Sequence, residues 1–222
     1  MSGARSGSSN ATLVESLTTA LRSDIVEGRI APGTRIRQAD IARKHGMSRI
    51  PVREAIVRLA TEGLLTVEPH VGATVAKLDL DELMEVYAIR EQLEPMAIEV
   101  GAARRTDEDM AVLRTLFLRL EEAASGREAR EWLAADYEYH FRMYRAARMP
   151  RLLPLIERCW NSTQQYRLAY VRRERRYDLA QAGHRLLLDA MARRDGESAR
   201  HVLVSHIRRV RSTLEHAPEL FT

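Results

Sequence analysis

The stretch ADIARKHGMSRIPVREAIVRLATEGLL, residues 39–65, decides the architecture of the N-terminal part of the chain. Residues 38–45 predict a short helix that ends at Gly46, because glycine readily takes the left-handed conformation found at helix ends. A second helix starts almost at once, with Ser48 as its N-cap. Its apolar residues recur on one face and predict a buried stripe made of Val52, Ile56, Leu59 and Ala60. Two helices joined by so short a turn predict a helix-turn-helix.

The segments on either side complete a compact unit. Leucine or isoleucine occurs at every fourth position from Leu13 to Ile25, which predicts a first helix over residues 13–27. After the helix pair, GLLTVEPHVGATVAKL (residues 63–78) predicts two short strands joined by a turn at residues 69–72. Three helices followed by such a wing predict a winged helix-turn-helix domain over residues 11–77. The small polar residues 1–10 predict a disordered leader.

From residue 78 onward the apolar residues repeat with the period of a helix. Breaks near residues 101–106, 125–126, 149–150 and 195–196 divide this part of the chain. At roughly one helix per 15 to 25 residues, the pattern predicts an all-α antiparallel bundle of about six helices over residues 78–217. The fold class is therefore expected to be mainly α, with a winged helix-turn-helix followed by a helical domain.

Composition excludes several classes of protein. Charged residues make up 30% of the chain and hydrophobic residues 45%, which excludes a fully disordered protein, and the formal net charge of +4 favours polyanionic partners. The single cysteine, Cys159, excludes an intramolecular disulfide and a cluster of thiolate metal ligands, as expected in a reducing cytoplasm. No apolar run approaches the roughly 18 residues of a membrane-spanning helix, so we expect a cytoplasmic protein without a membrane partner.

Positive charge is concentrated in the helix-turn-helix, where residues 35–58 contain seven basic side chains and two acidic ones. Arg49 and Arg53 lie four positions apart near the start of the second helix, so they share one face. A helix in the major groove contacts bases through its N-terminal end, and arginine can bind guanine O6 and N7 together. An arbitrary basic helix is more often only a solvated surface. Here the tight turn, the short preceding helix and the wing favour DNA binding.

The stretch from IVEGRIAPGTRI (residues 25–36) through residue 65 resembles the winged helix-turn-helix of the GntR family of bacterial repressors. Its most specific run is SRIPVREAI, residues 48–56. The resemblance implies that a homodimer binds a short, near-palindromic operator in double-stranded DNA. It also implies that Ser48, Arg49 and Arg53 contact DNA, and that Arg35 and Arg43 contact phosphates.

Two departures from the family pattern leave the operator sequence open. The family often has threonine where this chain has Ile50, and a basic residue where this chain has Val71 before the wing glycine. We expect Ile50 to touch a thymine methyl group and His70 to take the place of the missing basic residue in the minor groove.

A second group of polar residues lies in the helical part. In DYEYHFRMY (residues 136–144), Asp136 and His140 are four positions apart and leave the same face of a helix. His184 and His206 lie 22 residues apart, and Gly196 between them should turn the chain so that the last two helices are antiparallel. An Asp-xxx-His pair by itself is more often structural than metal-binding.

Residues 79–217 resemble the FCD effector domain of the FadR branch of the same family, beginning with the helix YAIREQLEPMAIEVGA (residues 87–102). The resemblance implies that one divalent transition metal is bound by Asp136, His140, His184 and His206. Zinc is the first expectation for three imidazoles and a carboxylate, and nickel, manganese or iron also suit them. One departure is Gly183, which stands where the branch commonly has an acidic residue, and its lack of a side chain is expected to loosen the support around His184.

Such a metal leaves coordination positions open for the carboxylate of a small organic acid. The resemblance places Arg90 where it would clamp that carboxylate, since a guanidinium meets a carboxylate through two parallel hydrogen bonds. An ordinary salt bridge between Arg90 and Glu94 at i+4 is an equal alternative. Cys159 and Trp160 are expected in the helix core.

We therefore expect a ligand-responsive DNA-binding transcription regulator, most simply a repressor, and not an enzyme. One alternative is a sensor in which the metal itself is the signal. Another is a metal-dependent hydrolase, because a metal on three histidines can activate water. The sequence contains no nucleophile elbow, no glycine-rich phosphate loop and no His-Glu-x-x-His pair, so the hydrolase is the weaker alternative.

Overall fold

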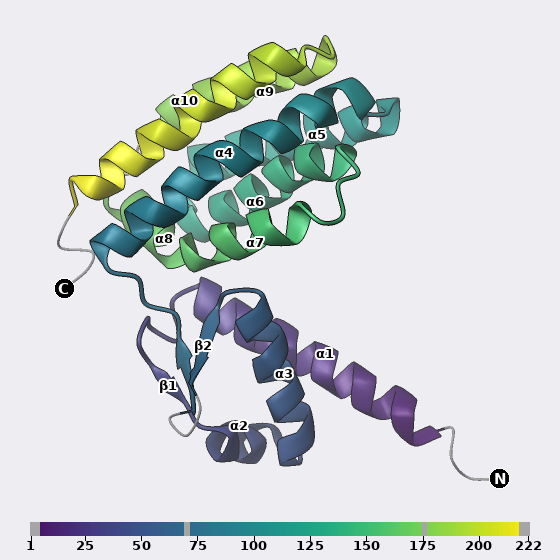
Figure 1. Cartoon of the computed structure of the whole chain (residues 1–222), viewed down its shortest axis with the longest axis vertical. Helices are drawn as coiled ribbons and strands as arrows, with labels where there is room; N and C mark the ends of the chain where they lie inside the picture. The colour runs from purple at the N-terminus through teal and green to yellow at the C-terminus, as the bar shows by residue number, and fades with distance from the viewer. Residues whose placement is uncertain (1–4, 69–71, 175–176, 218–222) are drawn as a thin grey trace. The chain divides into compact units, whose positions relative to one another are not determined.

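A computed structural model of the chain describes residues 5–68, 72–174 and 177–217. The chain divides into two compact units, residues 1–77 and 78–222. Both are mainly helical, as expected, and only the first contains strands among the residues that the structure describes (Figure 1). None of the described helices is long and apolar enough to cross a membrane.

The first unit contains three helices and a small antiparallel sheet. The elements are α1 (Arg5–Val26), β1 (Arg35–Ile36), α2 (Gln38–His45), α3 (Arg49–Thr61), β2 (Leu65–Glu68) and β3 (Gly72–Val75). The strands lie in the order β1-β3-β2, with Thr66 of β2 and Arg35 of β1 both opposite Thr74 of β3. The two-stranded wing is confirmed. Strand β1 was not predicted, because a strand of two residues is too short to show an alternating pattern.

Helix α1 begins earlier than the apolar spacing predicts. Residues 5–10, expected in a disordered leader, belong to this helix in the structure, and residues 1–4 lie outside the described part of the chain. The leader contains small polar residues with no apolar stripe, so the period that predicts the helix from Leu13 onward has no counterpart there.

The turn between α2 and α3 has the predicted geometry. Gly46 ends α2 in the left-handed region, with φ 62° and ψ 34°, and Ser48 precedes α3 in an extended conformation. The predicted stripe on α3 is buried, apart from Ala60, which is half-buried. Val52, Ile56 and Leu59 pack with Leu17, Leu21 and Ile25 of α1. The core on this inner face leaves the opposite face of α3 to solvent.

The second unit is a bundle of seven helices in the part of residues 78–222 that the structure describes. They are α4 (Leu80–Arg104), α5 (Asp107–Gly126), α6 (Ala129–Ala146), α7 (Leu153–Ser162), α8 (Gln164–Glu174), α9 (Tyr177–Ala192) and α10 (Gly196–Glu215). Helix α4 packs against α10 and α6, and α9 packs against α10 and α5. Asp79 and Thr106 start α4 and α5 with capping boxes, in which each side chain bonds to the helix backbone three residues on.

The prediction of about six helices did not include the break between α7 and α8. Only Thr163 separates these two helices, and its hydroxyl donates to the carbonyl oxygen of Trp160 at 2.9 Å. Neither glycine nor proline marks the position, so the sequence carries no breaker signal there.

The core of the bundle contains an unusual number of polar side chains. Aromatic and aliphatic residues from all helices form one cluster. Within the same unit the buried polar set includes Arg90, Glu94, Asp136, His140, Arg167, His184 and His206. Charges are seldom buried unless they are paired or bind a ligand, so this set locates the candidate site of the unit.

Gly101 brings α4 and α6 into close contact. A Cβ atom at this position would overlap the carbonyl oxygen of Met143 on α6. We therefore expect Gly101→Ala to lower the free energy of unfolding by about 1–3 kcal/mol, although alanine is the better helix former. Urea denaturation followed by circular dichroism measures the change. Gly126→Ala is the matched control, since that glycine is exposed and a Cβ there would meet only Glu128 Cγ at 3.6 Å. Equal stability of Gly101→Ala and the wild type would contradict the close packing.

Candidate DNA-contact helix and candidate metal cavity

The solvent face of α3 carries the side chains expected to contact bases. Arg49 and Arg53 are exposed, and Ile50 is exposed over 66% of its surface. Ser48 makes no side-chain bond to the helix that it precedes. Val57, one turn beyond Arg53, is 55% exposed and was missed by the sequence analysis, although its i+4 spacing from Arg53 places it on the same face. The core needs none of these side chains, so the face is available to a partner.

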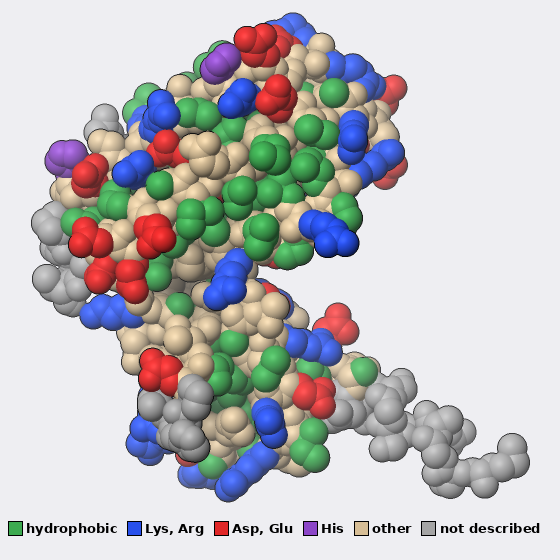
Figure 2. Space-filling model, in the orientation of Figure 1, with side chains coloured by type: hydrophobic (Ala, Val, Ile, Leu, Met, Phe, Trp, Pro, Cys, Tyr) green, Lys and Arg blue, Asp and Glu red, His purple; other side chains and the backbone are tan. Residues whose placement is uncertain are grey.

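The remaining residues expected to contact DNA lie on other elements of the first unit or outside the described residues. Arg35 is exposed on β1, and Arg43 is exposed on α2, where it pairs with Asp40 at 2.7 Å. His70 lies outside the described residues. In the view of Figure 2, several Lys and Arg side chains gather at the end of the first unit where α2 lies.

A cavity of about 60 Å³ lies inside the helical unit. Its described wall is built by side chains from six helices, α4 and α6 to α10. They include Arg90 of α4, His140 of α6, Trp160 of α7, Arg167 of α8 and His206 of α10. The volume exceeds what one or two water molecules need, so a small molecule can be accommodated.

Three histidines from three helices meet beside this cavity. His140, His184 and His206 are buried, and one ring nitrogen from each lies within 4.8 Å of the others. The Nε2 atoms of His140 and His184 are 3.2 Å apart. The pairwise ring-centroid distances are 5.0–5.4 Å. A buried triad of this geometry can hold a metal ion.

Asp136 lies next to the triad, one helical turn before His140. Its Oδ1 is 3.1 Å from Nε2 of His184 and 3.6 Å from Nε2 of His140. This oxygen is buried and has no hydrogen-bond partner in the described part of the chain. A buried carboxylate oxygen that faces imidazole nitrogens without a donor is what a cation would satisfy, so the donor set fits a divalent transition metal.

The protonation states favour metal binding. Burial lowers the pKa of His140 to about 3, despite the opposing attraction of Asp136. Burial also holds the pKa of His206 well below its ordinary value, and the nearby histidines add to this. Burial would raise the pKa of Asp136, but His184, His140 and Arg167 outweigh it and hold that pKa below the usual range. Near neutral pH, His140 and His206 are therefore uncharged, Asp136 is ionised, and lone pairs are available to a cation.

Further side chains orient the histidine rings. Tyr144 Oη lies 3.3 Å from Nδ1 of His140 and donates to Glu94 at 2.7 Å. Nδ1 of His184 lies 2.9 Å from Oε1 of Gln181. Gly183, which was expected to affect the support of His184, faces His206 instead. A Cβ at position 183 would lie 3.0 Å from Nδ1 of His206.

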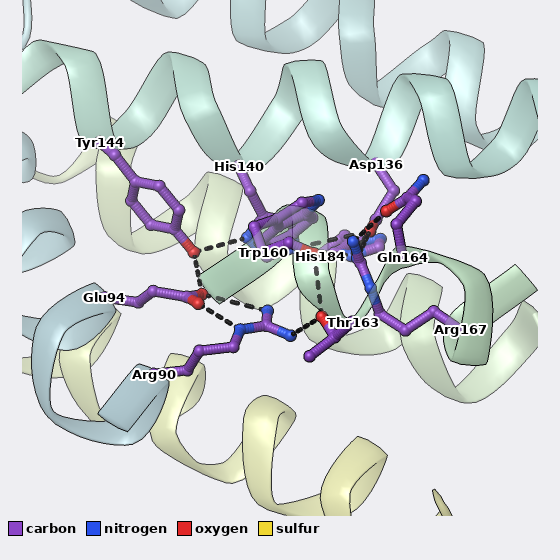
Figure 3. Close-up of polar contacts among 10 residues, drawn as sticks. All are labelled: Arg90, Glu94, Asp136, His140, Tyr144, Trp160, Thr163, Gln164, Arg167 and His184. Atoms are coloured by element: carbon purple, nitrogen blue, oxygen red, sulfur yellow. Dashed lines mark hydrogen bonds and ion pairs between the residues drawn. The ribbon is translucent and has the colours of Figure 1, made fainter. Parts of the chain in front are cut away.

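Arg90 makes the salt bridge with Glu94 that was one of its two expected roles, and it also lines the cavity. It also donates to the hydroxyl of Thr163 at 3.3 Å, and its guanidinium lies 4.6 Å from the centre of the Trp160 ring (Figure 3). Burial opposes the charge of Arg90, but the carboxylate of Glu94 more than compensates and raises its pKa above the ordinary value.

Arg167 also belongs to the site, although it was not predicted from the sequence. This residue of α8 is buried, and its guanidinium lies 4.0 Å from the ring centre of Trp160 and 3.3 Å from Oδ2 of Asp136 (Figure 3). Its sequence surroundings, QQYRLAYVRRE, contain further arginines at short intervals. Nothing in that pattern shows which arginine points inward.

Two protein-family models match the chain. The model described as "Bacterial regulatory proteins, gntR family" matches residues 13–75, and the model described as "FCD domain" matches residues 85–209. The second match alone spans more than half of the 222 residues.

Individual relatives agree with these matches. The "Probable D-xylose utilization operon transcriptional repressor" of Paenarthrobacter nicotinovorans is 34% identical over 187 residues, which are 83% of this chain and 80% of that protein. The "HTH-type transcriptional repressor GlaR" of Escherichia coli (strain K12) is 27% identical over 199 residues, 84% of this chain and 89% of its own. Among solved structures, E. coli McbR/YncC matches with a TM-score of 0.80 and 27% identity, over 92% of this chain and 97% of that chain.

These relatives are transcription regulators. The expectation of a DNA-binding regulator, and not an enzyme, is therefore confirmed.

Binding of a metal should be measurable as stabilisation. We expect zinc to raise the melting temperature of metal-free protein, because a ligand present at a thousand times its Kd adds about 4 kcal/mol to the free energy of unfolding. His184→Ala should weaken zinc binding by at least about a hundredfold. Titration calorimetry and thermal denaturation measure both effects. His201→Ala is the control, since His201 is an exposed histidine on α10. Wild-type zinc affinity in the His184 variant would show that the triad holds no metal.

Proposed function

Since the chain belongs to the GntR family of bacterial regulatory proteins and carries an FCD domain, we propose that it is a repressor controlled by a small organic acid. In this proposal the acid binds in the cavity of the helical unit, beside a metal ion. The observation that carries the proposal is the convergence of His140, His184 and His206 with Asp136 at the wall of a buried cavity.

The proposed DNA contact is made by a homodimer in the cytoplasm on a near-palindromic operator. Arg49 and Arg53 contact base edges in the major groove, and Ile50 contacts a thymine methyl group. The phosphate contacts come from the N-terminal end of α3 at Ser48 and from Arg35 and Arg43. His70 is assigned to the minor groove. The exposure of Arg49, Ile50 and Arg53 on one face of α3 supports this arrangement.

The proposed metal site uses Asp136, His140, His184 and His206. Zinc is the first candidate, and nickel, manganese and iron are also suited to this donor set. When bound, the metal supplies positive charge and open coordination positions for a carboxylate. The protein holds the rings in place through Tyr144 on His140 and Gln181 on His184. Arg90 lies in the wall of the same cavity and is the guanidinium that the resemblance assigns to the acid.

The proposed response to the acid follows from the structure of the cavity wall. A ligand there touches residues of α4, α6, α7, α8 and α10 at once, so it favours one arrangement of these helices. It can change operator affinity only as far as it binds that arrangement more tightly than the other. In the dimer, a shift of the helices would alter the spacing of the two copies of α3, which must match the operator half-sites.

A second candidate function is direct sensing of the metal. The short distance between His140 and His184 favours it, because a cation alone could draw the three helices together. The two functions differ in the effect of chelation on DNA binding at fixed pH.

The DNA contact is tested with Arg49→Ala and an operator fragment selected from random duplexes by the wild-type protein. Each bidentate contact to guanine contributes about 1–3 kcal/mol of discrimination, and a dimer loses two, so specific binding should fall to the level of unrelated DNA. Fluorescence anisotropy at a fixed salt concentration measures the operator affinity. Arg200→Ala, an exposed arginine of α10, is the control with the same charge change. Operator affinity within threefold of the wild type would contradict the assignment of Arg49.

The effector is tested by adding EDTA, and separately a panel of short mono- and dicarboxylates, to the complex of zinc-loaded protein and operator. We expect the complex to survive EDTA and to be weakened by at least one acid. The His184→Ala variant should bind the operator like metal-free wild type and should not respond to the acid. Dissociation by EDTA alone would favour the metal sensor. A normal acid response in His184→Ala would show that the response does not require the metal.

A further inference from the structure

Two buried arginines face one tryptophan in the cavity wall. The guanidinium groups of Arg90 and Arg167 lie 4.6 Å and 4.0 Å from the ring centre of Trp160. Both side chains are at most 6% exposed. A buried cation is costly unless a counter-charge compensates it. The contacts of each arginine therefore show which of them has capacity for an anionic ligand.

Arg90 belongs to a closed network. Its Nε and Nη2 donate to the two carboxylate oxygens of Glu94, and its Nη1 donates to Thr163. Glu94 also accepts from Tyr144. The ion pair joins residues four positions apart on one helix, and a ligand carboxylate would have to displace Glu94 from a fully buried place. The charge of Arg90 is thus already compensated.

The charge of Arg167 is compensated far less than the charge of Arg90. Its Nη2 donates to the neutral side chain of Gln164, and its Nη1 is 3.3 Å from Oδ2 of Asp136. Its Nε is buried and has no hydrogen-bond partner in the described part of the chain. Burial and the like charge of Arg90 lower the pKa of Arg167 to about 10. Among the described residues, the carboxylate in contact with Arg167 is that of Asp136, which also faces His140 and His184.

Resting on the proposed function, we infer that Arg167 binds the carboxylate of the effector, and that the effector is a small monocarboxylate with an apolar chain. A cation at the histidines would attract Asp136 and leave Arg167 without a counter-charge. A ligand carboxylate in the cavity supplies it and can accept from the free Nε. Arg90 remains paired with Glu94 and closes the wall of the cavity.

The rest of the cavity wall sets the chemical class of the acid. The apolar side chains of Val171, Leu203, Ile207 and Val210 also line it. The described lining residues include two arginines, Arg90 and Arg167, and Arg90 is already paired with Glu94. One ligand carboxylate can meet both Arg167 and the open positions of the metal, because Asp136 already spans Arg167 and His184 with its two oxygens. A second carboxylate on the ligand would then be buried without a counter-charge, which costs several kcal/mol. With about 60 Å³ available, a chain of few carbons fits, and a monocarboxylate is favoured over the dicarboxylate of equal length.

Butyrate and succinate, both four-carbon acids, test the inference by titration calorimetry on the zinc-loaded full chain. Wild type should bind butyrate at least tenfold more tightly than succinate. Arg167→Gln should weaken butyrate binding at least tenfold, and Arg167→Lys, which keeps the charge, should restore part of it. Zinc affinity is measured for each variant, and in Arg167→Gln it should not fall, because a neighbouring cation has been removed. Arg158→Gln, an exposed arginine on α7, is the control for the change in charge.

Each outcome has one meaning. Butyrate affinity in Arg167→Gln equal to that of the wild type overturns the role of Arg167 and leaves the proposed function standing. Tighter binding of succinate than of butyrate overturns the inference that the effector is a monocarboxylate. A parallel loss of zinc and butyrate affinity in Arg167→Gln assigns the residue a structural role and also overturns the inference. If zinc-loaded wild type binds no acid of the carboxylate panel, the proposed function itself fails.

Discussion

The burial of charge inside the helical unit is the constraint on which the site depends. Among the described residues, Arg90, Arg167, Glu94, Asp136 and three histidines lie in a core built mainly of aromatic and aliphatic side chains. Such a core is stable only if each charge is compensated. Glu94 compensates Arg90 within α4, whereas Asp136 must serve both the histidines and Arg167. In the proposed function, this shared carboxylate links the binding of the metal to the binding of the effector.

The two units use their polar residues in opposite ways. On α3 the side chains of Arg49, Ile50 and Arg53 are exposed, and the buried stripe on the other face holds the helix in place. In the helical unit the polar side chains point inward from several helices, so a bound group reaches all of them at once. An exposed face suits a large, charged partner such as DNA, and an internal cavity suits a small molecule.

Several details could not be predicted from the sequence. Thr163 separates α7 from α8 without a glycine or proline, so the break carried no signal. Gly183 was expected to affect its neighbour His184, but the packing of α9 on α10 places it against His206. Arg167 is one of several arginines in α8, and only the fold shows that it is buried against Trp160. The ion pair of Arg90 with Glu94 could be expected from their i, i+4 spacing, but only the fold shows that Arg90 also lines the cavity.

Local sequence patterns were enough to predict the helix periods, the turn at Gly46, the wing and the i, i+4 pair Asp136 and His140. These features depend on residues within one or two helical turns, where spacing alone decides which side chains share a face. The packing of the helices shows that His184 and His206 lie beside that pair, as the family resemblance implied, and that Arg167 shares Asp136 with the histidines. Those facts depend on how helices distant in the chain pack together, and local spacing carries no information about distances between helices.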